Sequence, residues 1–291
     1  SNIDPNQSGL WGGVIVLGKA PISAETNEDG QRSVEGIPTD DPTSFFGGSN
    51  PGHSSGTLKY VSIRHGGTNI GQGNEINGLT LGGVGTGTTV EHIEVVANQD
   101  DGIECFGGTV NLNNTVVWNQ EDDAYDMDQA YQGTLDNIIA VEGANSDHGF
   151  ELDGPEGSKS GAYTLKNATI KGATGTDNQY ADLRDDCRAT LENIYYFNFP
   201  ANATFELNDE ATAQNYLDGD VQLSNIEINV SHIDDGNTTI DEIFLVDEGS
   251  TAAFDDQAPD ASIVSSPEDA GADKAPLQWT WAAEAGALSD L

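Results

Sequence analysis

A short motif that recurs along the chain constrains the fold more than any other feature. An apolar residue, any residue and then asparagine occur together, and an alternating apolar strand follows each copy. The asparagines are Asn114, Asn137, Asn167, Asn193 and Asn225, while Tyr60 and His92 fill the same position in two earlier copies. Successive copies are 32, 22, 23, 30, 26 and 32 residues apart. A repeated strand with insertions of variable length is typical of a solenoid, and alternation with period two indicates a β-solenoid.

The repeat predicts an all-β protein, a right-handed parallel β-helix of about 8–10 coils. Because equivalent residues of successive coils stack, we expect the asparagines to face inward and to form a hydrogen-bonded ladder. Three glycine pairs, Gly47-Gly48, Gly82-Gly83 and Gly107-Gly108, are predicted to form sharp corners, since glycine tolerates a positive φ.

We expect residues 1–291 to form a single β-helix domain, because a solenoid adds its core one coil at a time. Residues 10–22 are the predicted first coil and residues 23–55 an acidic insertion. The regular coils are predicted over residues 56–247, and residues 248–291 are predicted to be a C-terminal cap that contains Trp279 and Trp281.

Acidic residues occupy one fixed place in the repeat, between two apolar residues that are expected to point inward. These acids are Glu104, Asp126, Glu151, Asp182 and Glu206. Further acids lie just before or after this position, namely Asp100, Asp101, Asp122, Asp123, Asp147, Asp177 and Asp209. Equivalent residues of a parallel sheet lie about 4.8 Å apart. Neighbouring carboxylates would repel by roughly 3 kcal/mol at an effective dielectric near 20, so cations are expected between them.

Calcium is the cation that this pattern favours. Ca²⁺ accepts six to eight oxygen ligands in flexible geometry, whereas Mg²⁺ needs a stricter octahedron. Zinc prefers nitrogen and sulfur ligands, and the chain has 5 His and 2 Cys. We therefore predict several Ca²⁺ ions stacked between coils, with Glu75 and Asn77 closing the column on its N-terminal side.

The charge of the chain excludes some partners. With 49 acidic residues against 10 Lys and Arg, the formal net charge is -39, which disfavours binding to nucleic acid. A solvated surface adapted to salt is the alternative explanation for the acids in general. The sequence has no apolar stretch long enough for a transmembrane helix. We expect an extracellular or cell-surface protein whose signal peptide has already been removed.

Two enzymatic functions are alternatives. A polysaccharide lyase would need a base near an acidic sugar, and Arg184 with Arg188 is the candidate cluster. A glycoside hydrolase would need an acid and a base, which Asp122 and Asp123 could supply. Repetition of the acids along the chain favours a structural role over a catalytic one, because catalysis needs a single pair.

Several runs resemble a known group of proteins. Residues 10–22, 55–61, 74–79 and 100–110 are similar to secreted or lipid-anchored parallel β-helix proteins of marine and other Gram-negative bacteria. Cys105 departs from the aromatic residue expected in that group. The resemblance implies export and the β-helix fold, and it extends to the idea that cation-bridged β-helices stack into fibres.

The predicted function is a non-enzymatic extracellular structural protein, stabilised by Ca²⁺, that assembles with itself end to end into a filament. Exposed strand edges at the ends of a solenoid favour such contacts. The alternative is a monomeric adhesin or glycan-binding β-helix, since sugars stack on aromatic rings. The aromatic candidates for glycan contact are Trp118, Tyr131, Tyr163, Tyr195 and Tyr196.

Overall fold

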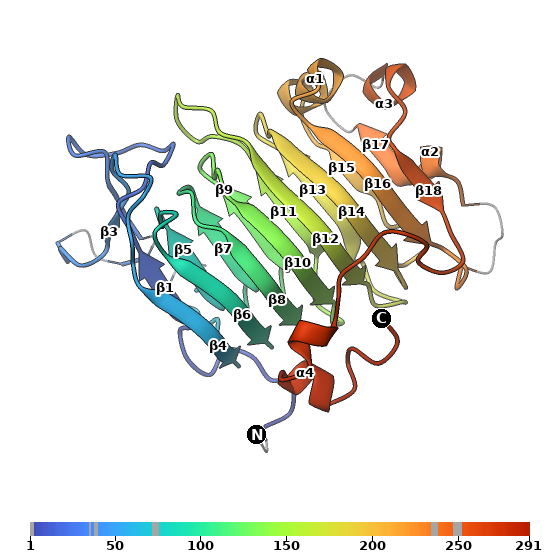
Figure 1. Cartoon of the computed structure of the whole chain (residues 1–291), viewed down its shortest axis with the longest axis horizontal. Helices are drawn as coiled ribbons and strands as arrows, with labels where there is room; N and C mark the ends of the chain where they lie inside the picture. Colours follow the sequence, from blue (N-terminus) through green and yellow to red (C-terminus); the bar gives the residue numbers. More distant parts are fainter. Residues whose placement is uncertain (1–2, 35, 38–39, 72–75, 234–237, 247–251) are drawn as a thin grey trace.

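The computed structural model describes residues 3–34, 36–37, 40–71, 76–233, 238–246 and 252–291. Within this part of the chain, two sheets of eight parallel strands lie on either side of one core and wind together as one solenoid (Figure 1). Each coil contributes one strand to each sheet, which gives eight coils. The predicted right-handed parallel β-helix is therefore confirmed.

The first sheet contains β1 (Val14–Leu17), β5 (Leu79–Gly82), β7 (Ile103–Phe106), β9 (Tyr125–Asp128), β11 (His148–Asp153), β13 (Gln179–Arg184), β15 (Phe205–Leu207) and β17 (Phe244–Val246). The second sheet contains β4 (Thr57–Arg64), β6 (Thr89–Val96), β8 (Leu112–Trp118), β10 (Thr134–Val141), β12 (Tyr163–Lys171), β14 (Ala189–Phe197), β16 (Gln222–Asn229) and β18 (Ala261–Ile263). Apolar residues stack in register between the sheets, as Leu81, Cys105, Met127 and Leu152 do, and these four are completely buried. The core thus repeats from coil to coil.

The asparagines of the repeat lie at a bend within the strands of the second sheet. Asn114, Asn137, Asn167 and Asn193 have φ between 54° and 58°, in the left-handed region. A left-handed residue interrupts the alternation of the strand, so two consecutive residues, such as Asp136 and Asn137, are half-buried between fully buried neighbours. The expectation that these side chains face inward is wrong for this reason: they line the outer surface of the bend.

The asparagines are nevertheless linked in the direction of the stack. Asn137 Nδ2 donates to Asn114 Oδ1 at 2.7 Å, Asn193 Nδ2 to Asn167 Oδ1 at 3.2 Å, and Asn225 Nδ2 to Asn193 Oδ1 at 3.0 Å. Between Asn137 and Asn167 the ladder is interrupted, because Asn167 donates to Asp136 instead. The ladder is therefore an external row of amides with one break.

The insertion at residues 23–55 lies beside the first sheet. It contains a short antiparallel pair, β2 (Arg32–Ser33) and β3 (Phe45–Phe46). The backbone N–H of Ser23 donates to the carbonyl of Gln129, and its carbonyl accepts from the N–H of Gly157. Arg32 forms an ion pair with Glu156. The insertion therefore contacts coils that lie far beyond it in sequence.

The C-terminal part of the chain divides into two. Helices α1 (Glu210–Asp218), α2 (Ile240–Ile243) and α3 (Ala252–Asp256) lie with β18 at the end of the solenoid. Of these helices, α1 and α2 precede residue 248, where the predicted cap begins. Residues 264–291, which we call the strap, instead run back across the outside of the second sheet (Figure 1). The strap contains a 3₁₀ turn, η1 (Ala275–Leu277), and α4 (Trp281–Glu284). Its contacts reach from β16 to β4, so it spans most of the coils.

Backbone N–H groups of the strap bond to side chains of the sheet that it crosses. Glu227 accepts bonds from residues 268, 269 and 270, at 2.8, 2.9 and 3.2 Å. Thr169 accepts from Ala272 at 2.8 Å, Asn137 from Asp273 at 2.7 Å and Glu94 from Ala282 at 2.8 Å. Apolar residues of the strap, Leu277 and Leu288 among them, cover Val116 and Ile139 in a cluster separate from the main core.

Candidate metal centre

The five acids that the repeat aligns lie in one row across the first sheet. The strand register pairs Glu104 with Asp126, Asp126 with Glu151, Glu151 with Asp182, and Asp182 with Glu206. Thr80 precedes the row and Leu245 follows it, so the acids end there. Parallel in-register pairing therefore produces the column of carboxylates that the sequence predicts.

Part of this row lies in a pocket of about 310 Å³. Carboxylates dominate its lining, which includes Asp100, Asp101, Glu104, Asp126, Asp128, Glu151 and Asp153. Val34 of the insertion and Ile76 of the loop before β5 form apolar parts of the wall, and Arg184 also lines the pocket. The insertion therefore helps to enclose the acids.

The most enclosed group in the pocket consists of Asp101, Glu104 and Asp126. One carboxylate oxygen of each lies within 4.8 Å of the other two, and all three residues are buried. Asp126 Oδ1 is buried without a hydrogen-bond partner, and so is Oδ1 of Asn77, whose amide nitrogen donates to Glu104. Carboxylate oxygens that converge in this way, with one buried oxygen of Asp126 lacking a donor, match the preference of Ca²⁺.

Burial and mutual repulsion dominate the electrostatics of this group. Burial, followed by the charge of Asp101, raises the pKa of Glu104 well above its usual value. Burial, followed by the charge of Glu104, does the same for the pKa of Asp126. For Asp101 burial is again first, followed by the charges of Asp126 and Asp123. Without a cation the group favours protons, and a divalent ion would compete with them.

A second group adjoins the first through a shared residue. Oxygens of Asp100, Asp101 and Asp122 also lie within 4.8 Å of one another. Asp101 Oδ1 accepts a bond from the backbone N–H of Asp123 at 3.0 Å, which ties two coils together. Five of the predicted ligands thus line the same pocket, with Asp122 beside them: Asp100, Asp101, Glu104, Asp126 and Glu151.

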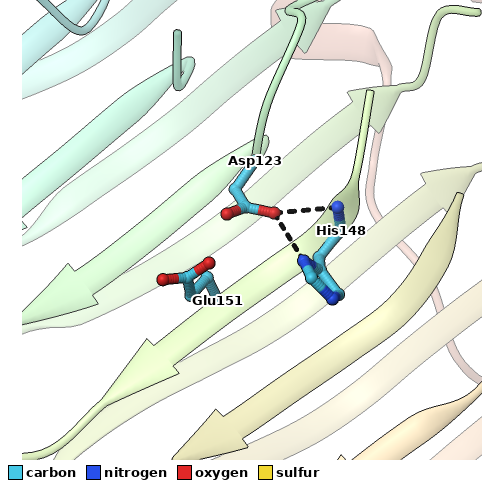
Figure 2. Close-up of side chains that lie close together, drawn as sticks. All are labelled: Asp123, His148 and Glu151. Carbon is cyan, nitrogen blue, oxygen red and sulfur yellow. Dashed lines mark hydrogen bonds and ion pairs between the residues drawn. The ribbon is translucent and has the colours of Figure 1, made fainter. Parts of the chain in front are cut away.

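A third group, Asp123, His148 and Glu151, behaves as an ion pair. Figure 2 shows Asp123 bonded to both the backbone N–H and the ring Nδ1 of His148, each at 2.8 Å. Burial lowers the pKa of His148, but the hydrogen bond and charge of Asp123, with Asp147 and Asp182, outweigh it and raise the pKa to about 9. A protonated imidazole has no lone pair to offer, so this group is a poor metal site at neutral pH.

The remaining predicted ligands lie outside the pocket. Asp147 is mainly exposed, and it lines with Asp122 and Asp177 a shallow groove at the edge of the coils. Glu206 accepts a bond from Thr204 Oγ1 at 2.6 Å. Asp209 is the N-cap of α1 and accepts from the backbone N–H of Thr212 at 2.9 Å. Glu75 lies outside the described residues.

Two acids of the pocket escaped the sequence-based prediction. Asp128 follows Asp126 by two residues, and Asp153 follows Glu151 by two, so both point to the same side of their strands. Burial, followed by the charge of Glu156, raises the pKa of Asp128 to about 7. The period of two in Tyr-Asp-Met-Asp and Phe-Glu-Leu-Asp was the signal that could have found them.

The aromatic residues expected to contact glycans do not form an exposed line. Tyr131, Tyr163, Tyr195 and Tyr196 are at most 5% exposed. Trp118 packs edge-on against Trp281 of the strap, with ring centroids 5.5 Å apart. These side chains therefore belong to the core and to the contact with the strap.

A comparison with protein families places the fold. The family described as a pectate-lyase-like β-helix domain matches residues 1–284. The chain belongs to this family. No curated protein and no solved structure matches the chain. Membership of this family establishes the architecture, while activity depends on the site, because one fold supports many functions. Within the described residues, no helix has the length and apolar character needed to cross a membrane.

Proposed function

We propose that this member of the pectate-lyase-like β-helix family binds Ca²⁺ through Asp101, Glu104 and Asp126, and that the ion stabilises an extracellular structural β-helix. The observation that carries the proposal is the buried Oδ1 of Asp126, which has no hydrogen-bond partner. It lies in a group of carboxylates that one loop and two strands supply. Asp101 precedes β7, Glu104 lies within β7, and Asp126 lies within β9. A bound ion would therefore link two successive coils.

Calcium fits this site better than other common cations. The available ligands are oxygens at irregular positions, which suits Ca²⁺ more than the octahedral Mg²⁺. The one histidine near the acids is paired with Asp123, so the nitrogen ligands that Zn²⁺ prefers are not offered by the group. Calcium is also plentiful outside cells, where we place the protein.

The test is calcium binding by the purified chain and by its Asp126→Asn variant, measured by isothermal titration calorimetry after treatment with chelator. The variant keeps the shape of the side chain and removes one charge, so we expect its affinity to fall at least tenfold. Ligand linkage predicts that calcium at 100 times the Kd raises the free energy of unfolding of the wild-type chain by about 2.7 kcal/mol. This gain should appear as a higher unfolding temperature.

The matched control is Glu192→Gln, an exposed carboxylate of β14 in the other sheet. It should leave binding and stabilisation unchanged. Equal calcium affinity in the wild-type chain and the Asp126 variant would contradict the proposed site.

A second candidate is the elimination reaction of a polysaccharide lyase. Arg184 lines the acidic pocket, and the family description names pectate lyase as the relative in fold. Three carboxylates surround its guanidinium, however, and the net charge of -39 repels an acidic sugar. Arg184→Ala should abolish, and Arg188→Ala should spare, any release of unsaturated product from acidic polysaccharides. No such product from the wild-type chain would remove this candidate.

End-to-end assembly is the further part of the structural proposal. Strands β1 and β4 are the edge strands at one end of the solenoid, and β17 and β18 are those at the other. Val14, Val16 and Leu58 of the first coil are only half-buried, although they pack on the core. At the far end Leu245 and Ile263 are 40% and 39% exposed. Although helices α2 and α3 contact β17 at the far end, partly exposed apolar residues on the edge strands of both ends support association of one copy with the next.

A further inference from the structure

Exposed apolar side chains of large size gather at the two ends of the solenoid. Among the described residues seven such side chains are at least 37% exposed, and all but Ile3 lie in the first coil, beside it or in the last coil. Leu10 and Trp11 are bonded to the carbonyls of His65 and Arg64 in the first coil. Gathered side chains of this kind mark a contact surface. The six are Leu10, Trp11, Tyr60, Ile70, Leu245 and Ile263.

The last coil leaves part of the core open. Helices α2 and α3 are corners of this coil, because α2 leads into β17 and α3 lies between β17 and β18 in the chain. Phe254 of α3 covers Phe244 of β17, with ring centroids 5.4 Å apart. Ile263 of β18 continues an inward column after Ile228, yet it is 39% exposed whereas Ile228 is completely buried. A further coil would cover Ile263.

The edge strands of the two ends carry matching side chains. Along the first sheet, residues 244–246 of β17 continue the columns that begin with residues 14–16 of β1, and all six residues are apolar. Along the second sheet, residues 261–263 of β18 continue the columns that begin with residues 61–63 of β4. Both of these triplets read apolar, serine, apolar. Stacking in the register of the coils would therefore pair like with like.

The acid row stops short of both ends. Ile15 and Thr80 precede its first member, Glu104, and Leu245 follows its last member, Glu206. If a second copy continued the sheet in the same register, three uncharged residues would separate the acid rows of the two copies. Carboxylates on neighbouring strands repel one another, and this row brings none together across such a joint.

We propose that copies of this chain join head to tail as one continuous parallel β-solenoid, in which β17 pairs with β1 of the next copy and β18 pairs with its β4. The inference rests on the end-to-end assembly of the proposed function and supplies its strand partners and register. The contact is heterologous, so each added copy leaves a free end and growth stays open. With eight coils at about 4.8 Å each, every copy lengthens the solenoid by about 38 Å.

The experiment cross-links two single-cysteine variants, Ser62→Cys and Ser262→Cys, with a short bis-maleimide after the two are mixed. The proposed register places the two cysteines side by side across the joint. Within one chain they lie on opposite edge strands of the second sheet, so a linked product must join two copies. The native Cys105 and Cys187 are completely buried. We expect a product with the mass of two chains in the mixture and not from either variant alone.

Thr57→Cys is the matched control for register. Thr57 is exposed on the same strand, five residues before Ser62, which is about 17 Å along a strand and beyond the reach of a short linker. Mixed with Ser262→Cys, it should give at least fivefold less product. Equal yields from the two mixtures would overturn the register. Linkage of Ser62→Cys to itself would show that the same ends meet, and it would overturn the head-to-tail joint.

A second measurement decides the matter if Ser62→Cys fails to fold, because Ser62 bonds to Glu94. Ile263→Lys places a charge in the joint, so growth in sedimentation velocity should fall at least fivefold. Glu192→Lys, on an exposed residue of β14 in the middle of the sheet, should leave growth unchanged. Equal growth of both variants would contradict the joint.

The calcium site is separated from the joint by repeating the cross-linking with Asp126→Asn in both chains and with chelator in place of calcium. Linked product under these conditions leaves the joint standing whether or not calorimetry detects calcium binding. Growth of the wild-type chain without linked product would overturn the register and keep the assembly. No growth of the wild-type chain at any concentration would overturn both the assembly and the joint, and calcium binding would then be judged by calorimetry alone.

Discussion

Individual carboxylates in this protein have different roles, and the surroundings of each decide its role. Asp209 accepts a hydrogen bond from a backbone N–H at the start of a helix, and Asp123 accepts one from the ring of His148. Both carboxylates therefore have donors within the chain. Asp126 has a buried oxygen with no donor. The same residue type can therefore cap, pair or bind an ion, and the availability of a donor decides among these roles.

The raised pKa values in the pocket predict how stability depends on pH. Asp128 has a pKa of about 7 in the folded chain against an ordinary 3.8, so the folded state holds more protons between these values. Without calcium, this contribution makes stability fall as the pH rises from about 4 to 7. Calcium binds the deprotonated carboxylates, so its benefit should grow over the same range.

Thermal unfolding at pH 5 and at pH 8, each with calcium and with chelator, checks this prediction. We expect a small difference between calcium and chelator at pH 5 and a larger one at pH 8. A difference of equal size at both values would mean that the pocket acids do not bind the ion.

At the scale of elements, the strap is held by hydrogen bonds to side chains and not by strand pairing. Glu227 is 3% exposed and accepts three backbone N–H groups of the strap. The apolar cluster beneath the strap is separate from the main core. We therefore expect the strap to detach more readily than the coils unfold.

Glu227→Ala is predicted to loosen the strap. Loss of a buried charged acceptor should lower the free energy of unfolding by about 1–3 kcal/mol. Limited proteolysis should then cut within residues 264–291 faster than in the wild type, while calcium affinity stays the same. Glu192→Ala, which removes an exposed acid from the neighbouring strand, is the control. Equal rates of cleavage in both variants would show that Glu227 does not anchor the strap.

At the scale of the whole molecule, the two apolar ends bear on assembly. Sedimentation velocity over a range of protein concentrations should reveal species that grow with concentration if copies join end to end. Lysine introduced at Val14 or Val16, on the edge strand β1, should reduce such growth by placing charge in the contact. A constant monomer at all concentrations would favour the alternative of a monomeric surface protein.

The sequence predicts the fold and the aligned acids because both depend on a local rule. Once the markers set the register, strand alternation places Glu104, Asp126, Glu151, Asp182 and Glu206 in one row. The orientation of the asparagines was mispredicted because a left-handed residue breaks that alternation. The engagement of Asp209 by Thr212 and the pairing of Asp123 with His148 depend on loops whose conformation has no period.

The path of the strap also cannot be predicted from the repeat, because the N–H of Ala282 bonds to Glu94, which lies 188 residues earlier in the sequence. Gln7 and Trp281 both contact His65, so the beginning and end of the chain meet at one coil. During synthesis, the first coils emerge long before the segment that covers them. The outer face of β8 and β10 must wait for residues 264–291, and a growing chain carries that apolar strip uncovered until the strap has emerged.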